Sequence, residues 1–143
     1  MTQEDKDLLL KDICVRLPYG VKSEIKYHDG IWKLLAIYTN GTTYATRDVG
    51  YPIETFFEDC KPYLFPLSSM TDELWDKEFM GCGITEFTRD SFKYGCETLE
   101  FNNSNPNLSS MVRFINQLIK NHFDIYGLIP TGLAIDATGL NIY

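Results

Sequence analysis

VKSEIKYHDGIWKLLAIYTNGTTYATRDV, residues 21–49, is the stretch of sequence that decides the fold. In its first seven residues Val21, Ile25 and Tyr27 share one face of an extended chain with Ser23, and charged residues occupy the other face. Alternation of this kind is typical of a strand with one buried side. The sequence therefore predicts that a sheet begins here.

Two dipeptides divide the stretch into three predicted strands. Asp29-Gly30 and Asn40-Gly41 favour the positive backbone angles of tight hairpin turns. Between them, residues 31–39 are rich in strand-forming residues and apolar on both faces. We therefore predict an antiparallel three-strand meander, with residues 53–60 as a candidate fourth strand.

A helix is predicted before the meander. Thr2 and Asp5 have the spacing of a capping box, which satisfies the free amides of a first helical turn. The residues that follow place one apolar stripe at Leu10, Ile13, Cys14 and Leu17. Because Pro18 disfavours helical geometry at the residue before it, the helix is predicted to span about residues 3–16.

Two further helices are predicted after the meander. Ser68, Ser69 or Thr71 can cap a short helix that runs to about Met80. Asn105 and Pro106 have the form of a cap and first position of the other helix. Its apolar stripe would be Met111, Phe114, Ile115, Leu118 and Ile119. The residues between these helices, 82–104, suggest one or two short strands and a loop.

The last residues, HFDIYGLIPTGLAIDATGLNIY, have the composition of a segment that folds back. Gly127, Pro130 and Gly132 reverse the chain, and residues 133–135 suit a short edge strand or a plug in the core. We therefore predict one α+β domain over residues 1–143, long enough to bury a core without metal or disulfide. It comprises an N-terminal helix, a three- to four-strand antiparallel meander, two further helices packed on one face, and a C-terminal segment folded back.

Charge and composition argue against several classes of function. The net charge of −7 repels phosphate backbones, and no cluster of Lys and Arg with interleaved aromatics counters it, which argues against direct nucleic-acid binding. No apolar run approaches the roughly 20 residues of a membrane span. The first twelve residues are acidic where a secretory signal is basic, which predicts a cytoplasmic protein without a membrane partner.

The cysteines and histidines give no metal or cofactor pattern. Cys14, Cys60, Cys82 and Cys96 include no CxxC pair. Cys14 lies on the predicted core stripe, and Cys82, between two glycines, is the cysteine expected to be accessible. Since the spacing of the cysteines and the two histidines resembles no ligand set, we expect no metal and no cofactor.

The sharpest catalytic hypothesis pairs His122 with Asp124 or Asp136 as a general base and its orienting carboxylate. No nucleophile motif or phosphate-binding glycine loop accompanies them. The structural alternative places His122 in the last helical turn, where its charge suits the helix dipole. The sequence favours this alternative and leans towards a protein that is not an enzyme.

A second candidate site is an apolar segment beside two prolines. Because Pro62 and Pro66 cannot donate to a sheet ladder, this segment is predicted to be extended chain that leaves the sheet. Its large side chains either cover the open side of the sheet, which the sequence favours, or form a patch that binds a partner. They are Tyr63, Leu64, Phe65 and Leu67.

Three blocks of the sequence resemble one known family. They are LLLKDICVRLPYGV, CKPYLFPLSSMT and NHFDIYGLIPTGLAIDATGLNIY. Together they resemble short uncharacterised proteins of Bacteroides-type gut bacteria, which are often encoded in prophage or other mobile regions. Residues 74–110 match no pattern of that family, and Ile125 and Pro130 make the last block more apolar than in its relatives. The resemblance implies a genomic setting and no activity.

Three functions follow as hypotheses. The first is a non-enzymatic cytoplasmic accessory protein of a mobile element that binds another protein. The second is an acidic DNA mimic that inhibits a nucleic-acid enzyme, which would array carboxylates along one face. The third is a small enzyme that uses His122 with Asp124 or Asp136. No small-molecule ligand is indicated by the sequence.

Overall fold

The computed structural model describes residues 1–96, 98–102 and 107–143. Its internal contacts divide the chain into two compact units. Unit 1 comprises Met1–Leu64 and Tyr126–Tyr143, and unit 2 comprises Phe65–Ile125. Each unit has its own hydrophobic core. The fold class is α+β, as predicted. The single domain over residues 1–143 remains a prediction.

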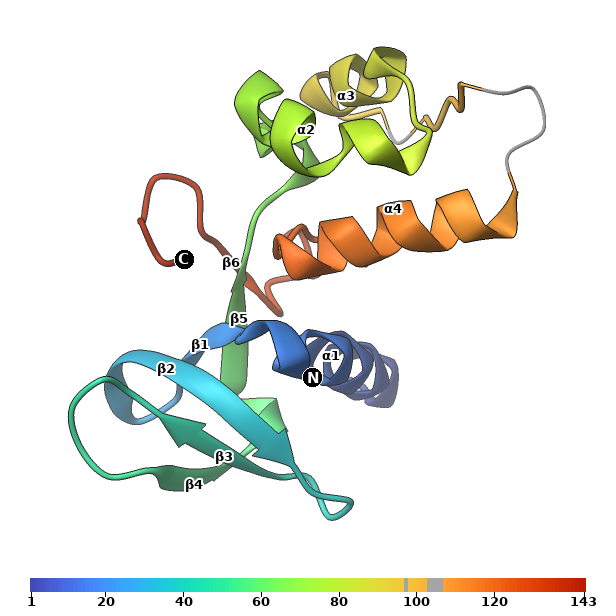
Figure 1. The fold of residues 1–143 in the computed structure, drawn as a ribbon. Helices are drawn as coiled ribbons and strands as arrows, with labels where there is room; N and C mark the ends of the chain where they lie inside the picture. The colour runs from blue at the N-terminus through green and yellow to red at the C-terminus, as the bar shows by residue number, and fades with distance from the viewer. Residues whose placement is uncertain (97, 103–106) are drawn as a thin grey trace. The chain divides into compact units, whose positions relative to one another are not determined.

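Unit 1 contains a sheet of order β4-β3-β2-β1-β5-β6. Its first four strands form the predicted antiparallel meander (Figure 1). The strands are β1 Lys22–Ile25, β2 His28–Ile37, β3 Thr42–Thr46, β4 Ile53–Phe56, β5 Cys60–Leu64 and β6 Ile135–Asp136. The predicted turn at Asn40-Gly41 is confirmed: Gly41 has φ 85°, and the Thr42 amide donates to Asn40 Oδ1 at 3.0 Å.

Helix α1, Gln3–Arg16, covers the inner face of this sheet. The capping box is confirmed, because the Asp5 amide donates to Thr2 Oγ1 at 3.1 Å and the Thr2 amide to Asp5 Oδ2 at 2.8 Å. The predicted stripe through Cys14 was wrong, since Cys14 is exposed. The buried face is instead Leu9, Asp12, Ile13 and Arg16. It has the same helical spacing, but two of its members are charged.

The first hairpin turns earlier than predicted. Ile25 pairs with His28, so the chain reverses at Lys26-Tyr27, and Asp29-Gly30 lies inside β2. Ser23 pairs with Trp32, so the single residue Glu24 on β1 is opposite all the residues between His28 and Trp32 on β2. These extra residues form a bulge in β2. Gly30, with φ 93°, still provides a positive backbone angle, but it serves this bulge and not the turn.

The observed turn places a bulky residue in the left-handed region. Tyr27 has φ 66° and is 87% exposed. Such a conformation costs roughly 1–2 kcal/mol for an ordinary L-residue and nothing for glycine. Glycine loses more backbone entropy on folding, which offsets about half of the free energy gained by relieving the strain. Tyr27→Gly should therefore raise the free energy of unfolding by about 0.5–1 kcal/mol in urea titrations. Tyr27→Ala keeps the Cβ and should give no gain; equal stabilisation by both variants would contradict the strain.

Strand β5 corrects the prediction for Pro62, whereas Pro66 lies beyond the strand in extended chain, as predicted. The strand pairs with β1 on one side and β6 on the other, so Pro62 lies in an internal strand. The Lys26 amide donates to the Asp59 carbonyl at 2.9 Å. In an antiparallel ladder every second pair of opposed residues is hydrogen-bonded, so the backbone nitrogen of Pro62, three positions after Asp59, faces away from β1. On the other side, pairing with β6 begins only at Tyr63. The missing N–H therefore removes no ladder hydrogen bond.

The C-terminal segment folds back as predicted. Leu133 and Ala134 enter the core of unit 1, and β6 adds to the edge of the sheet parallel to β5. The Ala137 amide donates to the Leu64 carbonyl at 2.8 Å and extends this pairing by one residue. The two alternatives for this segment, an edge strand and a core plug, are therefore both realised.

Unit 2 contains three α-helices among the described residues, one more than predicted. They are α2 Asp72–Glu78, α3 Glu86–Lys93 and α4 Leu108–Lys120. Thr71 caps α2, as predicted, by accepting from the Leu74 amide. Helix α3 replaces the strands expected within 82–104. The cap predicted at Asn105 and Pro106 lies outside the described residues, and α4 is capped by Asn107.

The core of unit 2 is largely aromatic. The Trp75 and Phe79 rings stack at 5.5 Å, and Phe79 meets the edge of Phe114 at 5.7 Å. Phe92 and Phe123 complete this set. Offset and edge-to-face arrangements of this kind are the favourable ones for aromatic side chains. None of the described helices is both long and apolar enough to span a bilayer.

Candidate functional site

The three candidate catalytic residues are divided between the units. His122 and Asp124 are buried in unit 2, and Asp136 is exposed on β6 in unit 1. Asp136 Oδ1 accepts from the Thr138 amide at 2.8 Å, which is the geometry of a side-chain turn at the end of a strand. The structure thus gives Asp136 a local structural partner.

His122 lies beyond α4 and not in its last turn, which corrects the structural alternative. Asn121 is the C-cap, and His122 follows with φ 60°. The His122 amide donates to the Ile119 carbonyl at 3.0 Å and the Phe123 amide to the Leu118 carbonyl at 2.9 Å. These two bonds define a Schellman motif, in which the residue after the C-cap takes the left-handed conformation. His122 therefore ends the helix through its backbone.

The candidate binding segment is packed inside the protein. Tyr63 and Leu64 are buried in β5, while Phe65 and Leu67 are half-buried and pack against the core of unit 2. The Phe65 amide donates to the His122 carbonyl at 2.9 Å, and its carbonyl accepts from the Asp124 amide at 2.8 Å. Tyr63 and Leu64 are therefore part of the sheet itself, and Phe65 and Leu67 are part of the packing of unit 2.

The predicted exposure of two cysteines was wrong. Cys82 is buried, whereas Cys14 and Cys96 are exposed. Burial, with a smaller effect from Asp59, raises the pKa of the Cys60 thiol to about 12, which disfavours the thiolate form that a nucleophile or ligand requires. Over residues 1–96, 98–102 and 107–143, no three His, Cys, Asp or Glu side chains gather closely enough to share a metal ion.

A polar closure in unit 1 was missed by the sequence. The Tyr143 hydroxyl donates to the Tyr63 carbonyl at 2.8 Å and accepts from the Lys22 amide at 3.0 Å. Burial is the main cause that raises the pKa of Tyr143 to about 12. Lys22 Nζ donates to the Ile142 carbonyl at 2.7 Å. Because the partners are at least eighty positions apart in the sequence, no local pattern could have revealed their contacts.

The outer face of the sheet carries several exposed side chains. Ala45 and Thr43 point inward and are fully buried, so the alternation of β3 turns Thr42, Tyr44 and Thr46 outward. Tyr44 pairs with Ala36 on β2 and with Glu54 on β4. The solvated face of an antiparallel sheet is ordinarily polar. Here it also carries large apolar groups.

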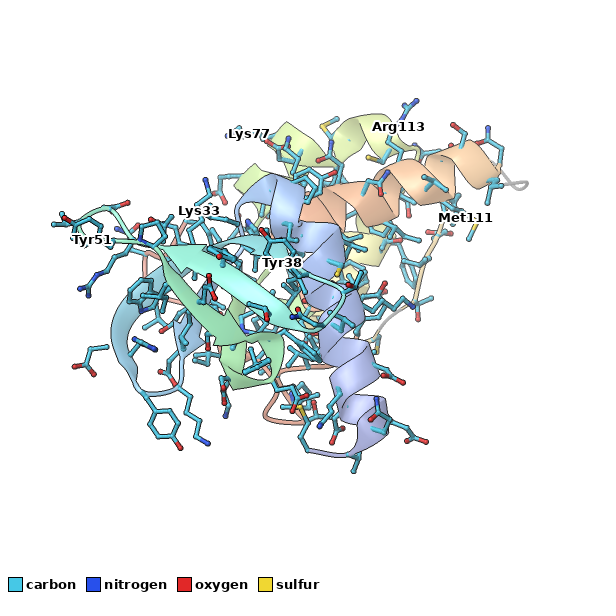
Figure 2. The ribbon with its side chains drawn as sticks, turned by 90° about the horizontal axis from the view of Figure 1, so that it is seen from below. Lys33, Tyr38, Tyr51, Lys77, Met111 and Arg113 are labelled. Atoms are coloured by element: carbon cyan, nitrogen blue, oxygen red, sulfur yellow. The ribbon has the colours of Figure 1, made fainter. Side chains whose placement is uncertain are left out.

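We call four of these side chains the outer patch: Leu35, Tyr38, Tyr44 and Phe56. Leu35 is 49% exposed, Tyr38 56% and Phe56 57%, and Tyr44 is half-buried between them. The Tyr38 and Tyr44 rings meet edge to face at 5.5 Å. Thr42 pairs with Phe56, which brings Phe56 beside Tyr44 across the strand diagonal. Tyr38 is labelled in Figure 2.

A hydrogen bond orders the centre of the outer patch. The Tyr44 hydroxyl donates to Glu54 Oε1 on the neighbouring strand. This bond is the main cause that raises the pKa of Tyr44, and the approach of Glu54 fixes the ring in one orientation. Fixed aromatic side chains lose little conformational entropy when they are covered by another surface. The outer patch therefore has the properties of a preformed contact surface.

Comparison with known proteins gives no relative. No profile of a protein family matches the chain, and no curated protein or solved structure matches it.

Proposed function

We propose that this chain is a non-enzymatic protein that acts by binding another protein through the outer patch. The observation that supports the proposal is the exposure of Leu35, Tyr38 and Phe56, with Tyr44 between β2 and β4, on the solvated face of an antiparallel sheet. Scattered exposed apolar residues need no explanation, but a contiguous aromatic group on a regular sheet is typical of an interface. The cytoplasmic location and mobile-element setting belong to the same proposal and depend on the sequence alone.

The proposed partner presents an apolar surface that covers the three exposed side chains. Tyr and Phe are enriched in interfaces because they supply large contact areas with few rotatable bonds. The apolar segment around Tyr63, proposed from the sequence for this role, would need residues that are buried in the structure. The outer patch serves the role without unfolding the sheet.

A second exposed apolar surface provides a matched comparison. On α4, Phe114, Leu118 and Ile119 are buried as the predicted stripe requires, but Met111 and Ile115 are exposed. Met111 is labelled in Figure 2. Leu108 and Val112 extend this exposed row. The row is aliphatic and lies on a helix of unit 2, so it can be mutated without touching the sheet.

The test is direct binding by variants of these two surfaces. A partner captured from lysate by the wild type would be purified, and its Kd measured for Tyr38→Ser/Phe56→Ser and for Val112→Ser/Ile115→Ser. The sheet variant should weaken binding by roughly tenfold or more, and the helix variant should bind normally. Light scattering of the free chain shows whether the partner is a second copy.

Two results would contradict the proposal. Unchanged binding by a folded Tyr38→Ser/Phe56→Ser variant would remove the outer patch from the interface. Loss of binding in the Val112→Ser/Ile115→Ser variant alone would move the interface to α4. Circular dichroism of each variant confirms that it is folded before binding is compared.

The DNA-mimic hypothesis remains an alternative with a structural counterargument. A mimic needs carboxylates that are free to replace phosphates. Several here are engaged: Asp72 lies 2.7 Å from Lys93, Glu78 lies 3.1 Å from Lys120, and Glu58 lies 2.9 Å from Lys6. The enzyme hypothesis, with His122 and Asp124 or Asp136, also remains a proposal, which the turnover of a His122→Gln variant would test once a substrate is found.

A further inference from the structure

A groove on unit 1 carries three cationic side chains in an acidic protein. It has a volume of about 520 Å³, and its lining includes Lys22, Lys33 and Arg47 with Ile31, Val49 and Asp48. We call it the basic groove. The net charge of the chain is −7, so a groove lined by residues drawn at random from this chain would more often carry acidic than basic side chains. Its volume lies within the roughly 300–1,000 Å³ of small-molecule sites.

Two of the cations face each other across neighbouring strands. Lys22 on β1 pairs directly with Lys33 on β2, and Lys33 pairs with Thr46 on β3. Directly opposed residues share a face of the sheet, and like charges in this position are destabilising. Elsewhere in the same sheet the rule is respected, because Glu24 is opposite Lys61. The Lys22–Lys33 pair therefore works against stability.

These cations are not neutralised by carboxylates. Six Lys and Arg residues form ion pairs with Asp or Glu among the residues that the structure describes, and none of them lines the basic groove. Lys22 Nζ donates to the Ile142 carbonyl at 2.7 Å and lies over the Tyr143 ring, 5.8 Å from its centroid. Asp48 supplies one negative charge to the lining against three positive ones.

The third cation is held in a fixed orientation. The Arg47 guanidinium lies over the Trp32 ring, 4.9 Å from its centroid. Its Nε donates to the Val49 carbonyl at 3.0 Å and its Nη1 to the Asp29 carbonyl at 3.5 Å. The bulge in β2 therefore supplies a carbonyl that positions Arg47. Bulges often place side chains at functional sites in this way.

We infer that the basic groove binds a small organic phosphate. Lys22 and Lys33 extend from directly opposed positions on one face of the sheet, so the anionic oxygens of a phosphate group can meet both ammonium groups, while Arg47 adds a third positive charge to the lining. Its charge would remove the repulsion between Lys22 and Lys33. The apolar side chains of Ile31 and Val49 line the groove beside these cations and suit the organic part of such a molecule. This inference is independent of the outer patch and its protein partner.

Ligand titration provides the first test. Phenyl phosphate and inorganic phosphate would be titrated into the ¹⁵N-labelled full chain at constant ionic strength, with sodium chloride as the compensating salt. Saturable shifts should centre on Lys33, Thr46 and Arg47, with tighter binding of phenyl phosphate. Lys33→Gln and Arg47→Gln should each weaken binding by roughly tenfold, as expected for the loss of one charge-assisted hydrogen bond.

The matched control is Lys61→Gln, which removes the same charge from the same sheet outside the basic groove. It should leave the affinity within about twofold, because a distant exposed charge is screened. Equal affinity in wild type and both groove variants would overturn the inference. So would an equal loss in Lys61→Gln, shifts spread over all surface lysines, or no saturable binding by the wild type.

Stability without ligand provides a second test. Lys33→Gln should raise the melting temperature by about 2 °C at low salt, because it removes the repulsion from Lys22, and the gain should fade in high salt. Lys61→Gln should give no gain, since it loses an attraction to Glu24. A lower melting temperature for Lys33→Gln than for Lys61→Gln would overturn the inference.

Discussion

Deletion of residues 133–143 should abolish the stable fold of unit 1. The deletion removes four buried apolar side chains, Leu133, Ala134, Ala137 and Ile142, together with strand β6. Burial of one large aliphatic side chain contributes roughly 1.5–3 kcal/mol, so the total loss is about 5 kcal/mol or more. A loss of this size approaches the whole stability of an ordinary domain, which is roughly 5–15 kcal/mol.

The two tryptophans make this result measurable in each unit separately. Trp32 lies in the core of unit 1 and Trp75 in the core of unit 2, and the chain has no others. In a Trp75→Phe background, urea unfolding followed by fluorescence therefore reports unit 1 alone. The deletion should remove the cooperative transition of Trp32. A truncated chain that keeps the wild-type transition would show that the C-terminal segment does not close the core.

A conservative variant separates the hydroxyl of Tyr143 from the rest of the segment. Tyr143→Phe should cost about 1–2 kcal/mol, since it leaves the Lys22 amide and the Tyr63 carbonyl without this partner. The pKa of Tyr143 is raised from 10.0 to about 12, so the phenol stabilises the fold fully below pH 10. That contribution should be lost as the pH rises through 12. The free energy of unfolding of the wild type should therefore fall more between pH 10 and pH 12 than that of Tyr143→Phe, measured by urea unfolding at each pH.

Breaking the buried ion pair of α1 should have the second large effect. Arg16 and Asp12 are fully buried, and Arg16 Nε lies 2.9 Å from both carboxylate oxygens while Nη2 lies 2.8 Å from Oδ1. Arg16→Met leaves a buried carboxylate that has lost its counter-charge. We expect a loss of about 3–5 kcal/mol in the free energy of unfolding, measured through Trp32 fluorescence in urea.

The double variant distinguishes the cost of an unpaired charge from the net contribution of the pair. Asp12→Leu/Arg16→Met replaces both charges by apolar groups and should be far less destabilised than Arg16→Met. Lys6→Gln, which breaks the exposed pair with Glu58, should cost less than about 1 kcal/mol. If the double variant were as unstable as the single one, packing and not charge would explain the loss.

The sequence predicted those elements that local chemistry determines. The capping box set the start of α1, Asn40-Gly41 set the second hairpin, and the glycines after His122 predicted a chain that returns to the sheet edge. Each of these features depends on residues a few positions apart, so the pattern contains the full physical cause. The α+β class followed from the same signals.

The errors arose where tertiary pairing overrides a local rule. Gly30 has the positive backbone angle that the sequence implied, but pairing of β1 with β2 uses it in a bulge. Pro62 lacks an amide hydrogen, yet its place in the ladder requires no N–H donor. The buried face of α1 contains Asp12 and Arg16 because they neutralise each other, which an apolar stripe cannot indicate. The buried face of α3 is Thr88, Ser91 and Phe92, so two of its three members are polar and form no apolar stripe.

The candidate surfaces were beyond sequence reasoning for a related reason. Tyr38, Tyr44 and Phe56 are adjacent only because three strands align in one register. The cations of the basic groove come from two strands, β1 and β2, and from the loop that follows β3. The alternation of the sequence places Lys22 and Lys33 on the outward faces of their strands. This pattern indicates an anion site only once the two residues are known to be opposite each other.

The discontinuity of unit 1 has a consequence for synthesis of the chain on the ribosome. Strand β5 is complete at Leu64, but its partner β6 begins at Ile135, seventy-one residues later. Until then the hydrogen-bonding edge of β5 has no strand beside it from its own chain, and an unpaired edge invites association with other strands. All of unit 2 emerges in this interval. The nascent chain should therefore be most prone to aggregation, and most dependent on chaperones, between these two points.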